Sequence, residues 1–291
     1  MKITLAQIDC RLGNIPANAR AHQQALLAAQ GQGAEFVIFP ELSLTGYRLR
    51  SNIHRVMLDD AEFAAIWAGT APPDVVNQEM FCLLGYVELT RRAALHNTIA
   101  LLRGGETIFR HRKVYLPSYG MFEEERYMRP GDRFRVVDIT SKSDERWRVG
   151  VLCCEDAWHS SAWTIMQARG VDLVVVPSAS PGRGVESERL GSQQSWYGIL
   201  ATHAEQAGCW VAYCNRVGFE DDIHFWGGSA LFAPTGEIVR QAPLLEPDML
   251  VADIDKRAIT TARLLTPLSA SEDWALTIRE LSAAYQEKIE E

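Results

Sequence analysis

The chain has 291 residues, of which 47% are hydrophobic and 23% are charged, a composition typical of a globular protein with a large buried core. Its formal net charge of −8 and its pI near 5.5 argue against a surface that binds nucleic acid, and the sequence contains no basic run. No apolar run reaches the roughly 20 residues that span a bilayer, so we expect no membrane partner either.

The first half of the chain alternates segments with strand and helix periodicity. In chain order, the predicted elements are a strand over 3–9, a helix over 18–30, a strand over 36–39, a helix over 53–69, a strand over 81–89, and a hairpin that joins 98–102 to 107–110. Gly31 and Gly33 end the first helix, and Pro40 and Glu41 end the strand over 36–39.

The second half repeats this alternation. The predicted elements are a strand over 147–153, a helix over 161–170, a strand over 171–176 stopped by Pro177, a helix over 185–208, a strand over 210–214, a hairpin that joins 229–232 to 237–239, and a helix over 273–291. Strands covered by helices predict an α/β fold, either as one Rossmann-like sheet or as two sheets packed face to face. Neither nucleotide-binding glycine fingerprint is present, and with no linker or repeat we expect one domain over residues 1–291.

Six cysteines suggest neither a metal site nor a disulfide framework. Cys153 and Cys154 are adjacent, and Cys209 and Cys214 have zinc-ligand spacing without a second Cys or His pair. A chain of this length does not need disulfides, and Asp9 interrupts what would be the apolar region of a signal peptide. We therefore expect a reduced, cytoplasmic protein that binds no metal.

Polar side chains follow several predicted strands, and ligands of open α/β sheets bind beyond such strand ends. These residues are Glu41, Lys113, Cys154, Glu155, Asp156, Ser178, Ser180 and Asn215. A thiol with an ordinary pKa of about 8.5 needs a base or a cation beside it before it can act as a nucleophile. Glu41 as the base and Lys113 as the cation are one interpretation, and a packed thiol with solvated Glu and Lys is the alternative.

Three ordered motifs then identify a family resemblance. The segments FPELSLTGY (39–47), HRKVYLP (111–117) and LCCEDAW (152–158) closely resemble the signature regions of the nitrilase superfamily, the carbon–nitrogen hydrolases. Accessory segments at 122–131, 177–181, 215–218 and 225–229 extend the likeness over nearly the whole chain. The resemblance implies a four-layer α-β-β-α sandwich, no organic cofactor, and a homodimer or larger homo-oligomer.

The resemblance also implies the chemistry. Carried over to this sequence, Glu41 is the general base, Lys113 the transition-state cation, Cys154 the nucleophile, and Glu124 a second glutamate, with Glu123 as the alternative register. The implied reaction is hydrolysis of a non-peptide C–N bond, in which a small-molecule amide gives an acid and ammonia through a thioester. A catalytically silent protein with the same fold is the opposing interpretation, and the complete Glu-Lys-Cys set argues against it.

The substrate is less closely defined. The Cys-Glu-Asp sequence at 154–156 most resembles the glutaminase-type domain of glutamine-dependent NAD synthetases, but no ATP-pyrophosphatase signature follows it. We expect a stand-alone amidase, with an ammonia-generating glutaminase subunit beside a synthetase partner chain as the alternative. The candidate substrate-binding residues are Glu155 and Tyr119 for an ammonium group, Trp158 and Tyr47 as pocket walls, and Ser178 and Ser180 as polar groups after a strand.

Overall fold

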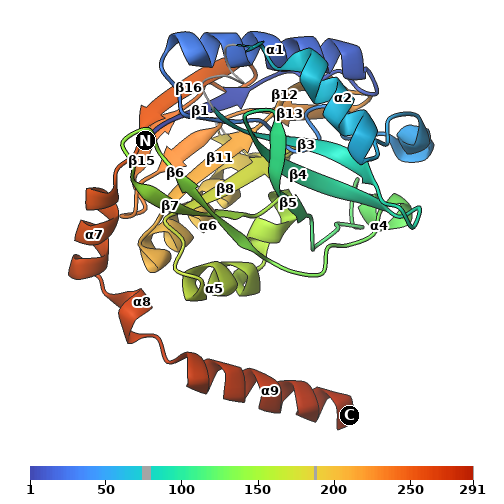
Figure 1. Cartoon of the computed structure of the whole chain (residues 1–291). Coiled ribbons are helices and arrows are strands. Elements are labelled where there is room, and N and C mark those ends of the chain that lie inside the picture. The colour runs from blue at the N-terminus through green and yellow to red at the C-terminus, as the bar shows by residue number, and fades with distance from the viewer. Residues whose placement is uncertain (74–79, 187–188, 291) are drawn as a thin grey trace.

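Two six-stranded sheets pack face to face, and helices cover the outer face of each (Figure 1). The structure is a computed structural model that describes residues 1–73, 80–186 and 189–290. Apolar side chains from both sheets fill the space between them, among them Ile38 and Leu83 from one sheet and Val149 and Val175 from the other. The layers are those of the expected α-β-β-α sandwich.

The first sheet has the strand order β16-β1-β2-β3-β4-β5. In that order its strands are Asp248–Asp253, Lys2–Gln7, Phe36–Ile38, Phe81–Leu89, Leu95–Arg103 and Glu106–Arg112. The strands β1, β2 and β3 run parallel, and the other pairs are antiparallel. Helices α1 (Ile15–Gly31) and α2 (Asp60–Thr70) cover its outer face, where Leu26 and Trp67 join one apolar cluster with Val37 and Cys82.

The second sheet has the order β15-β14-β11-β8-β7-β6. In that order its strands are Ile238–Gln241, Ala230–Phe232, Trp210–Asn215, Leu173–Ser178, Arg146–Val151 and Val136–Thr140. The central strands β7, β8 and β11 are parallel, and β8 and β11 are almost wholly apolar because both of their faces are covered. Helices α5 (Ser160–Ala168) and α6 (Gly191–Ala207) lie on the outer face.

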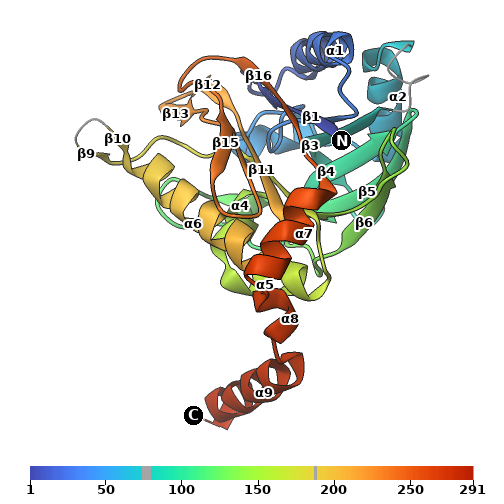
Figure 2. The same ribbon diagram turned by 90° about the vertical axis from the view of Figure 1, so that its left-hand side faces the viewer.

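The remaining elements connect the two sheets or extend from them. They are η1 (Arg50–Arg55), α4 (Glu124–Tyr127), η2 (Cys154–Trp158), β9 (Val185–Glu186), β10 (Arg189–Leu190), β12 (Val217–Glu220), β13 (Ile223–Trp226), α7 (Lys256–Leu265), α8 (Leu268–Ser271) and α9 (Trp274–Glu290). Figure 2 shows α7 to α9 leaving the sandwich, with α9 standing away from it. The single domain over residues 1–291 therefore stays a prediction. None of the helices in the described ranges has the length and hydropathy of a membrane span.

Several predicted boundaries were wrong, and three of them have a clear physical reason. The helix over 53–69 is two elements, because Leu58 leaves it to pair with the β3 backbone and Asp59 caps a new helix with a reciprocal bond to Glu62. The strand that was to stop at Pro177 continues to Ser178, since Pro177 lies beyond the last pair that β8 makes with β7 and its missing N–H is tolerated there.

The third wrong boundary is the start of α6. This helix begins at Gly191 and not at residue 185, because the preceding segment forms the short β9–β10 pair. Gly184 precedes β9 and has a φ of +64°, and its carbonyl accepts a 2.7 Å bond from the Gly191 N–H, which closes the open end of the β9–β10 pair where α6 begins.

The turn after β2 is pressed against β3. A Cβ atom on Gly85 of β3 would lie 2.2 Å from the backbone nitrogen of Leu42, so only glycine permits this approach. Leu42 itself has a φ of +47°, and the Leu44 N–H donates to the Gly85 carbonyl. These contacts hold Glu41 rigidly at the tip of the strand.

Candidate active site

Three charged side chains meet in a fully enclosed cluster at the strand ends of the first sheet. The Lys113 Nζ lies 2.7 Å from Glu41 Oε1 and 2.7 Å from Glu124 Oε1. The side chains of Lys113 and Glu41 are 0% exposed and that of Glu124 is 4% exposed. Buried charges are tolerated when they are paired and hydrogen-bonded, and here one ammonium serves two carboxyl groups.

Burial and the charges of the three groups shift the pKa values of Lys113 and Glu124. Burial alone would lower the pKa of Lys113, but the attraction of Glu124 and Glu41 outweighs it and the pKa of the ammonium lies well above its usual value. Burial raises the pKa of Glu124 to about 7, with Lys113 opposing and Glu41 adding to the rise. Lys113 is therefore a permanent cation near neutral pH, while Glu124 is poised to exchange a proton.

Polar groups that the sequence did not single out hold the two carboxyl groups. The Asn97 Nδ2 of β4 donates to Glu41 Oε1 at 2.7 Å and to Glu124 Oε2 at 3.5 Å. The backbone N–H of Ala179 donates to Glu41 Oε2 at 2.9 Å, so residues from both sheets fix the Glu41 carboxyl. The only signal for Asn97 in the sequence was an amide side chain inside an apolar strand.

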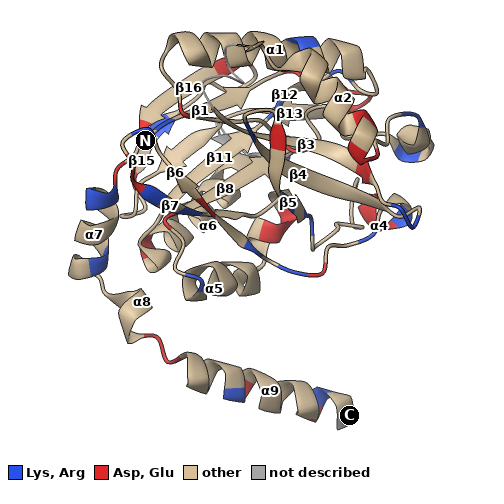
Figure 3. Cartoon of the chain, viewed as in Figure 1, with Lys and Arg blue, Asp and Glu red and all other residues tan. Residues whose placement is uncertain are grey.

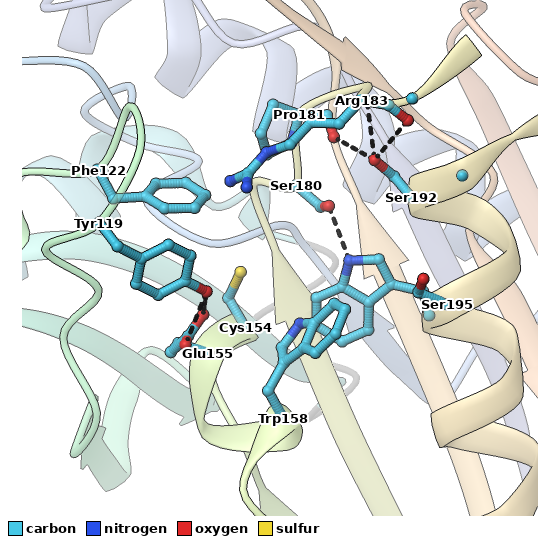
Figure 4. A pocket seen from close by; sticks show the side chains of 13 residues that line it. Tyr119, Phe122, Cys154, Glu155, Trp158, Ser180, Pro181, Arg183, Ser192 and Ser195 are labelled. Atoms are coloured by element: carbon cyan, nitrogen blue, oxygen red, sulfur yellow. Dashed lines mark hydrogen bonds between the residues drawn. The ribbon is translucent and has the colours of Figure 1, made fainter. Parts of the chain in front are cut away.

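The two adjacent thiols have different surroundings. Cys153 is 0% exposed within the core, as predicted, and its Sγ donates to Glu41 Oε1 at 3.5 Å. Cys154 is 8% exposed and lines a pocket, and Figure 4 shows its sulfur directed into that space. Its φ of +47° is rare for a residue with a side chain, and such strained positions cluster at functional sites.

Cys154 is also close enough to the charged cluster to be influenced by it. Burial, and after it the negative charge of Glu41, raises the pKa of the Cys154 thiol well above its usual value, and Lys113 only partly counteracts them. The resting group is a neutral thiol. A reaction at this sulfur therefore needs a base that removes the proton as the sulfur attacks.

The pocket has a volume of about 420 Å³ and combines aromatic walls with a few polar groups. Its lining includes Tyr119, Phe122, Cys154, Glu155, Trp158, Ser180, Arg183, Ser192 and Trp196. Ser180 Oγ accepts a 2.8 Å bond from the Trp196 indole, and the rings of Trp158 and Trp196 meet edge to face at 5.2 Å. The segment before β9 supplies Arg183, and α6 supplies Ser192 and Trp196.

Opposite charges line this pocket. The Tyr119 hydroxyl donates to both oxygens of Glu155 at 3.0 Å, and burial together with Glu155 raises the pKa of Tyr119 to about 12. The Arg183 guanidinium lies 4.5 Å from the centre of the Phe122 ring. Figure 4 shows the Glu155 and Arg183 side chains on either side of the Cys154 sulfur. A small ligand that reaches the thiol would therefore lie between an anion and a cation.

The predicted binding residues divide into two groups. Tyr119, Glu155, Trp158 and Ser180 line the pocket, while Tyr47 and Ser178 are not among its lining residues. Tyr47 lies behind the cluster and its hydroxyl donates to Glu124 Oε1 at 2.6 Å.

Three further residues were placed as follows. Ser178 is fully buried at the end of β8. Of the two glutamate registers, Glu124 contacts Lys113, whereas Glu123 is exposed beside Arg50.

Two features of the pocket were missed from the sequence. Arg183 and Phe122 were not proposed as binding residues, although Arg183 stands between Gly182 and Gly184 just past a strand, where a loop can carry a ligand contact.

No group of three or more His, Cys, Asp or Glu with metal-site geometry occurs within the ranges that the structure describes.

Comparison with known proteins gives the family. The carbon–nitrogen hydrolase family model matches residues 2–264. The chain belongs to the carbon–nitrogen hydrolase family. The nitrilase-superfamily resemblance of the sequence motifs is confirmed, and this carbon–nitrogen hydrolase is an enzyme.

Its curated relatives include glutamine-dependent NAD(+) synthetases. The protein from Thermotoga maritima is 30% identical over 259 residues, which are 88% of this chain and 42% of that protein. The structure of the Acinetobacter baumannii synthetase in complex with ADP has a TM-score of 0.77 at 28% identity and is matched over 46% of its length. The chain thus spans less than half the length of these relatives.

A second group of similar structures is matched over its full length. A mutant of the amidase from Nesterenkonia sp. AN1, in which acrylamide has added to the active-site cysteine, has a TM-score of 0.73 at 25% identity. The match covers 91% of this carbon–nitrogen hydrolase and 97% of that amidase. A yeast member of branch 10 of the nitrilase superfamily, at 20% identity and a TM-score of 0.77, shows the same fold.

The surroundings of the thiols predict how they react. Iodoacetamide should alkylate Cys154 and spare the other five cysteines of the native protein, because those five are at most 1% exposed. The rate should rise about tenfold per pH unit between about pH 6 and 9, since the thiolate is the reactive form and the raised pKa keeps it scarce. Intact-mass analysis and peptide mapping measure both.

Two variants serve as controls for this labelling. Cys154→Ala should take up no label, and Cys153→Ala should still be labelled at Cys154. A label on Cys153, or a rate that levels off near neutral pH, would contradict the assignment.

Proposed function

We propose that this enzyme hydrolyses the amide of a small molecule to an acid and ammonia, with Cys154 as the nucleophile and a thioester as the intermediate. One observation carries the proposal: the Cys154 thiol lines a pocket, and the residue before it, Cys153, contacts Glu41 of a buried Glu-Lys-Glu cluster. The similarity to amidases whose active site contains a cysteine supports it.

The attack step uses the base that the neutral thiol requires. Glu41 takes the proton while the Cys154 sulfur attacks the amide carbon, and general-base assistance of this kind is typically worth about 10²- to 10⁴-fold in rate. Glu41 is suited to this role because Lys113, Asn97 and the Ala179 N–H hold its carboxyl group in place.

The developing oxyanion meets Lys113 and the backbone N–H of Glu155. Removing one such donor typically costs about 10²- to 10³-fold in kcat. Glu41 then returns its proton to the leaving nitrogen, ammonia departs, and a water activated by the same carboxylate releases the acid from the thioester. Glu124 keeps the Lys113 ammonium directed at the reacting carbon, with Tyr47 and Asn97 holding Glu124 in turn.

The charges of the pocket favour an amide that carries both an ammonium and a carboxylate. Glu155 with the Tyr119 hydroxyl is complementary to the ammonium, and Arg183 is complementary to the carboxylate. Glutamine has both groups at one end and a primary amide at the other. Trp158 and Ser180 then enclose the chain that joins the two ends.

A second function is favoured by a specific observation. The relatives named above are glutamine-dependent NAD(+) synthetases of which this chain spans less than half. The chain would then be a glutaminase subunit that delivers ammonia to a synthetase partner chain. Both functions share the thioester chemistry and differ only in where the ammonia goes.

The exposed stripe of α9 supports the homo-oligomer that the sequence motifs implied. Ile278, Leu281 and Tyr285 repeat at a spacing of three and four residues, and they are 66%, 66% and 63% exposed. This is the spacing with which two helices pair. We infer that α9 of a second copy of the chain covers this stripe.

The cytoplasmic location stays a prediction, which the six free cysteines support.

Ammonia release distinguishes the two functions. The purified chain should release ammonia from glutamine or another amide of a substrate panel. Glu41→Gln should lower kcat at least about 10²-fold. Cys154→Ala should abolish both ammonia release and the acyl adduct that mass spectrometry detects. Release that requires an added synthetase chain would favour the second function. Full activity of Cys154→Ala would exclude both.

A pair of substrates tests the pocket charges. Arg183→Met and Glu155→Gln should each raise KM for glutamine about 10- to 100-fold, because each leaves one substrate charge unpaired, and should change KM for uncharged propionamide little. Arg126→Met, on an exposed arginine that pairs with Glu123, is the matched control. Equal effects on the two substrates would remove the assignment.

Light scattering tests the role of α9. The double variant Ile278→Lys and Leu281→Lys should reduce the mass of the native protein to that of one chain, because charge in the stripe opposes helix pairing. Glu287→Lys, on the opposite side of the helix, should leave the mass as it is. A wild-type protein with the mass of one chain at micromolar concentration would contradict this pairing.

A further inference from the structure

A buried carboxylate next to the candidate nucleophile has no place in the chemistry described so far. Asp156 lies in η2, two residues after Cys154, and is 0% exposed. A carboxylate enclosed to this degree is stable only when its oxygens accept hydrogen bonds. All the donors that reach it come from the segments that carry Lys113 and Cys154.

The two oxygens of Asp156 serve different segments. Oδ1 accepts the backbone N–H groups of Val114 at 3.0 Å and Tyr115 at 2.9 Å, directly after Lys113. Oδ2 accepts the His111 Nε2 at 2.7 Å and the Cys153 N–H at 3.1 Å. Lys113 is thus flanked on both sides along the chain by groups bonded to Asp156, and Cys154 lies between Cys153 and Asp156 itself.

This arrangement joins the two sheets at the reacting groups. The His111–Tyr115 segment leaves β5 of the first sheet, and the Cys153–Asp156 segment leaves β7 of the second. The Lys113 ammonium and the Cys154 sulfur belong to different layers, so their separation depends on what connects the layers locally. His111 is itself fixed, because it is 2% exposed and its ring stacks on Phe134 with centroids 6.0 Å apart.

We propose that Asp156 is a positioning residue that sets the distance between Lys113 and Cys154 by binding both of their segments. The inference rests on the proposed amide hydrolysis, since it concerns the same reaction. Asp156 touches neither substrate nor sulfur in this role. It acts by holding the cation where the oxyanion forms.

Asparagine is a sharp test because it cannot keep all four bonds. Whichever way its amide is turned, the NH₂ group faces at least one backbone N–H that then loses its acceptor: Val114 and Tyr115 on one side, or Cys153 on the other, where the His111 ring can adapt by changing its tautomer. The Lys113 segment is then free to shift, and a displacement of about 1 Å at a reacting group costs on the order of 10²-fold in rate. Asp156→Asn should therefore lower kcat about 100-fold and change KM less than about threefold.

Thiol alkylation separates positioning from general damage. Iodoacetamide needs the Cys154 sulfur but no oxyanion cation, so Asp156→Asn should be alkylated within about threefold of the wild-type rate. Asp172→Asn is the matched control, since Asp172 accepts the Arg148 N–H at 2.8 Å at the opposite end of β8 and should leave kcat unchanged. A loss of alkylation equal to the loss of kcat would show a collapsed pocket and overturn the inference.

His111 gives a second test if Asp156→Asn does not fold. His111→Phe keeps the ring but removes one donor and should lower kcat about tenfold, and His111→Gln restores a donor at a similar reach and should return kcat to within about threefold. Equal kcat for His111→Phe and wild type would overturn the inference. A wild-type enzyme that releases no ammonia from any amide would instead refute the proposed function, before any variant is compared.

Discussion

An ammonium buried between two carboxyl groups constrains everything around it. Lys113, Glu41 and Glu124 are almost completely enclosed, and each is stable there only because the others and their hydrogen-bond partners replace the lost water. Asn97 and Tyr47 donate to the same carboxyl oxygens as Lys113, and the Ala179 N–H donates to the second oxygen of Glu41. The surrounding structure must therefore keep these groups within a few tenths of an ångström of their places, and the rigid sheet ends do so.

The fold provides that rigidity through its layers. The two six-stranded sheets face each other (Figure 1). Glu41 and Lys113 follow strands of the first sheet and Cys154 and Ala179 follow strands of the second, and the bonds of Glu41 to Cys153 and Ala179 join the two sides. Glycine at position 85 lets the Glu41 turn press on β3, and Asp156 ties the Lys113 segment to the Cys154 segment. Figure 3 shows many of the charged residues on loops and helices, and Arg216 with Glu220 forms a second enclosed ion pair.

Much of this was predictable from the sequence, for local reasons. Apolar runs such as 173–176 fix the central strands, and the polar residues after such runs made Glu41, Lys113 and Cys154 candidates, whereas their roles came from the family resemblance of the motifs. Asn97 and Asp156 were not assigned these contacts, because their partners are remote in sequence and no local pattern encodes them. The predicted start of α6 was wrong for a related reason. Helical periodicity continues upstream of Gly191, but the bond between the Gly184 carbonyl and the Gly191 N–H closes the β9–β10 pair there instead.

The division of the site between two sheets bears on how the protein folds. Residues 41 and 154 are separated by more than a hundred positions, and pairings of such long range form slowly because the intervening chain must be ordered first. The first sheet on its own would carry the Glu-Lys-Glu cluster without the thiol, and the second sheet would carry the thiol without the cluster. Competence for chemistry therefore requires the docking of the two layers, because neither layer carries both the base and the thiol.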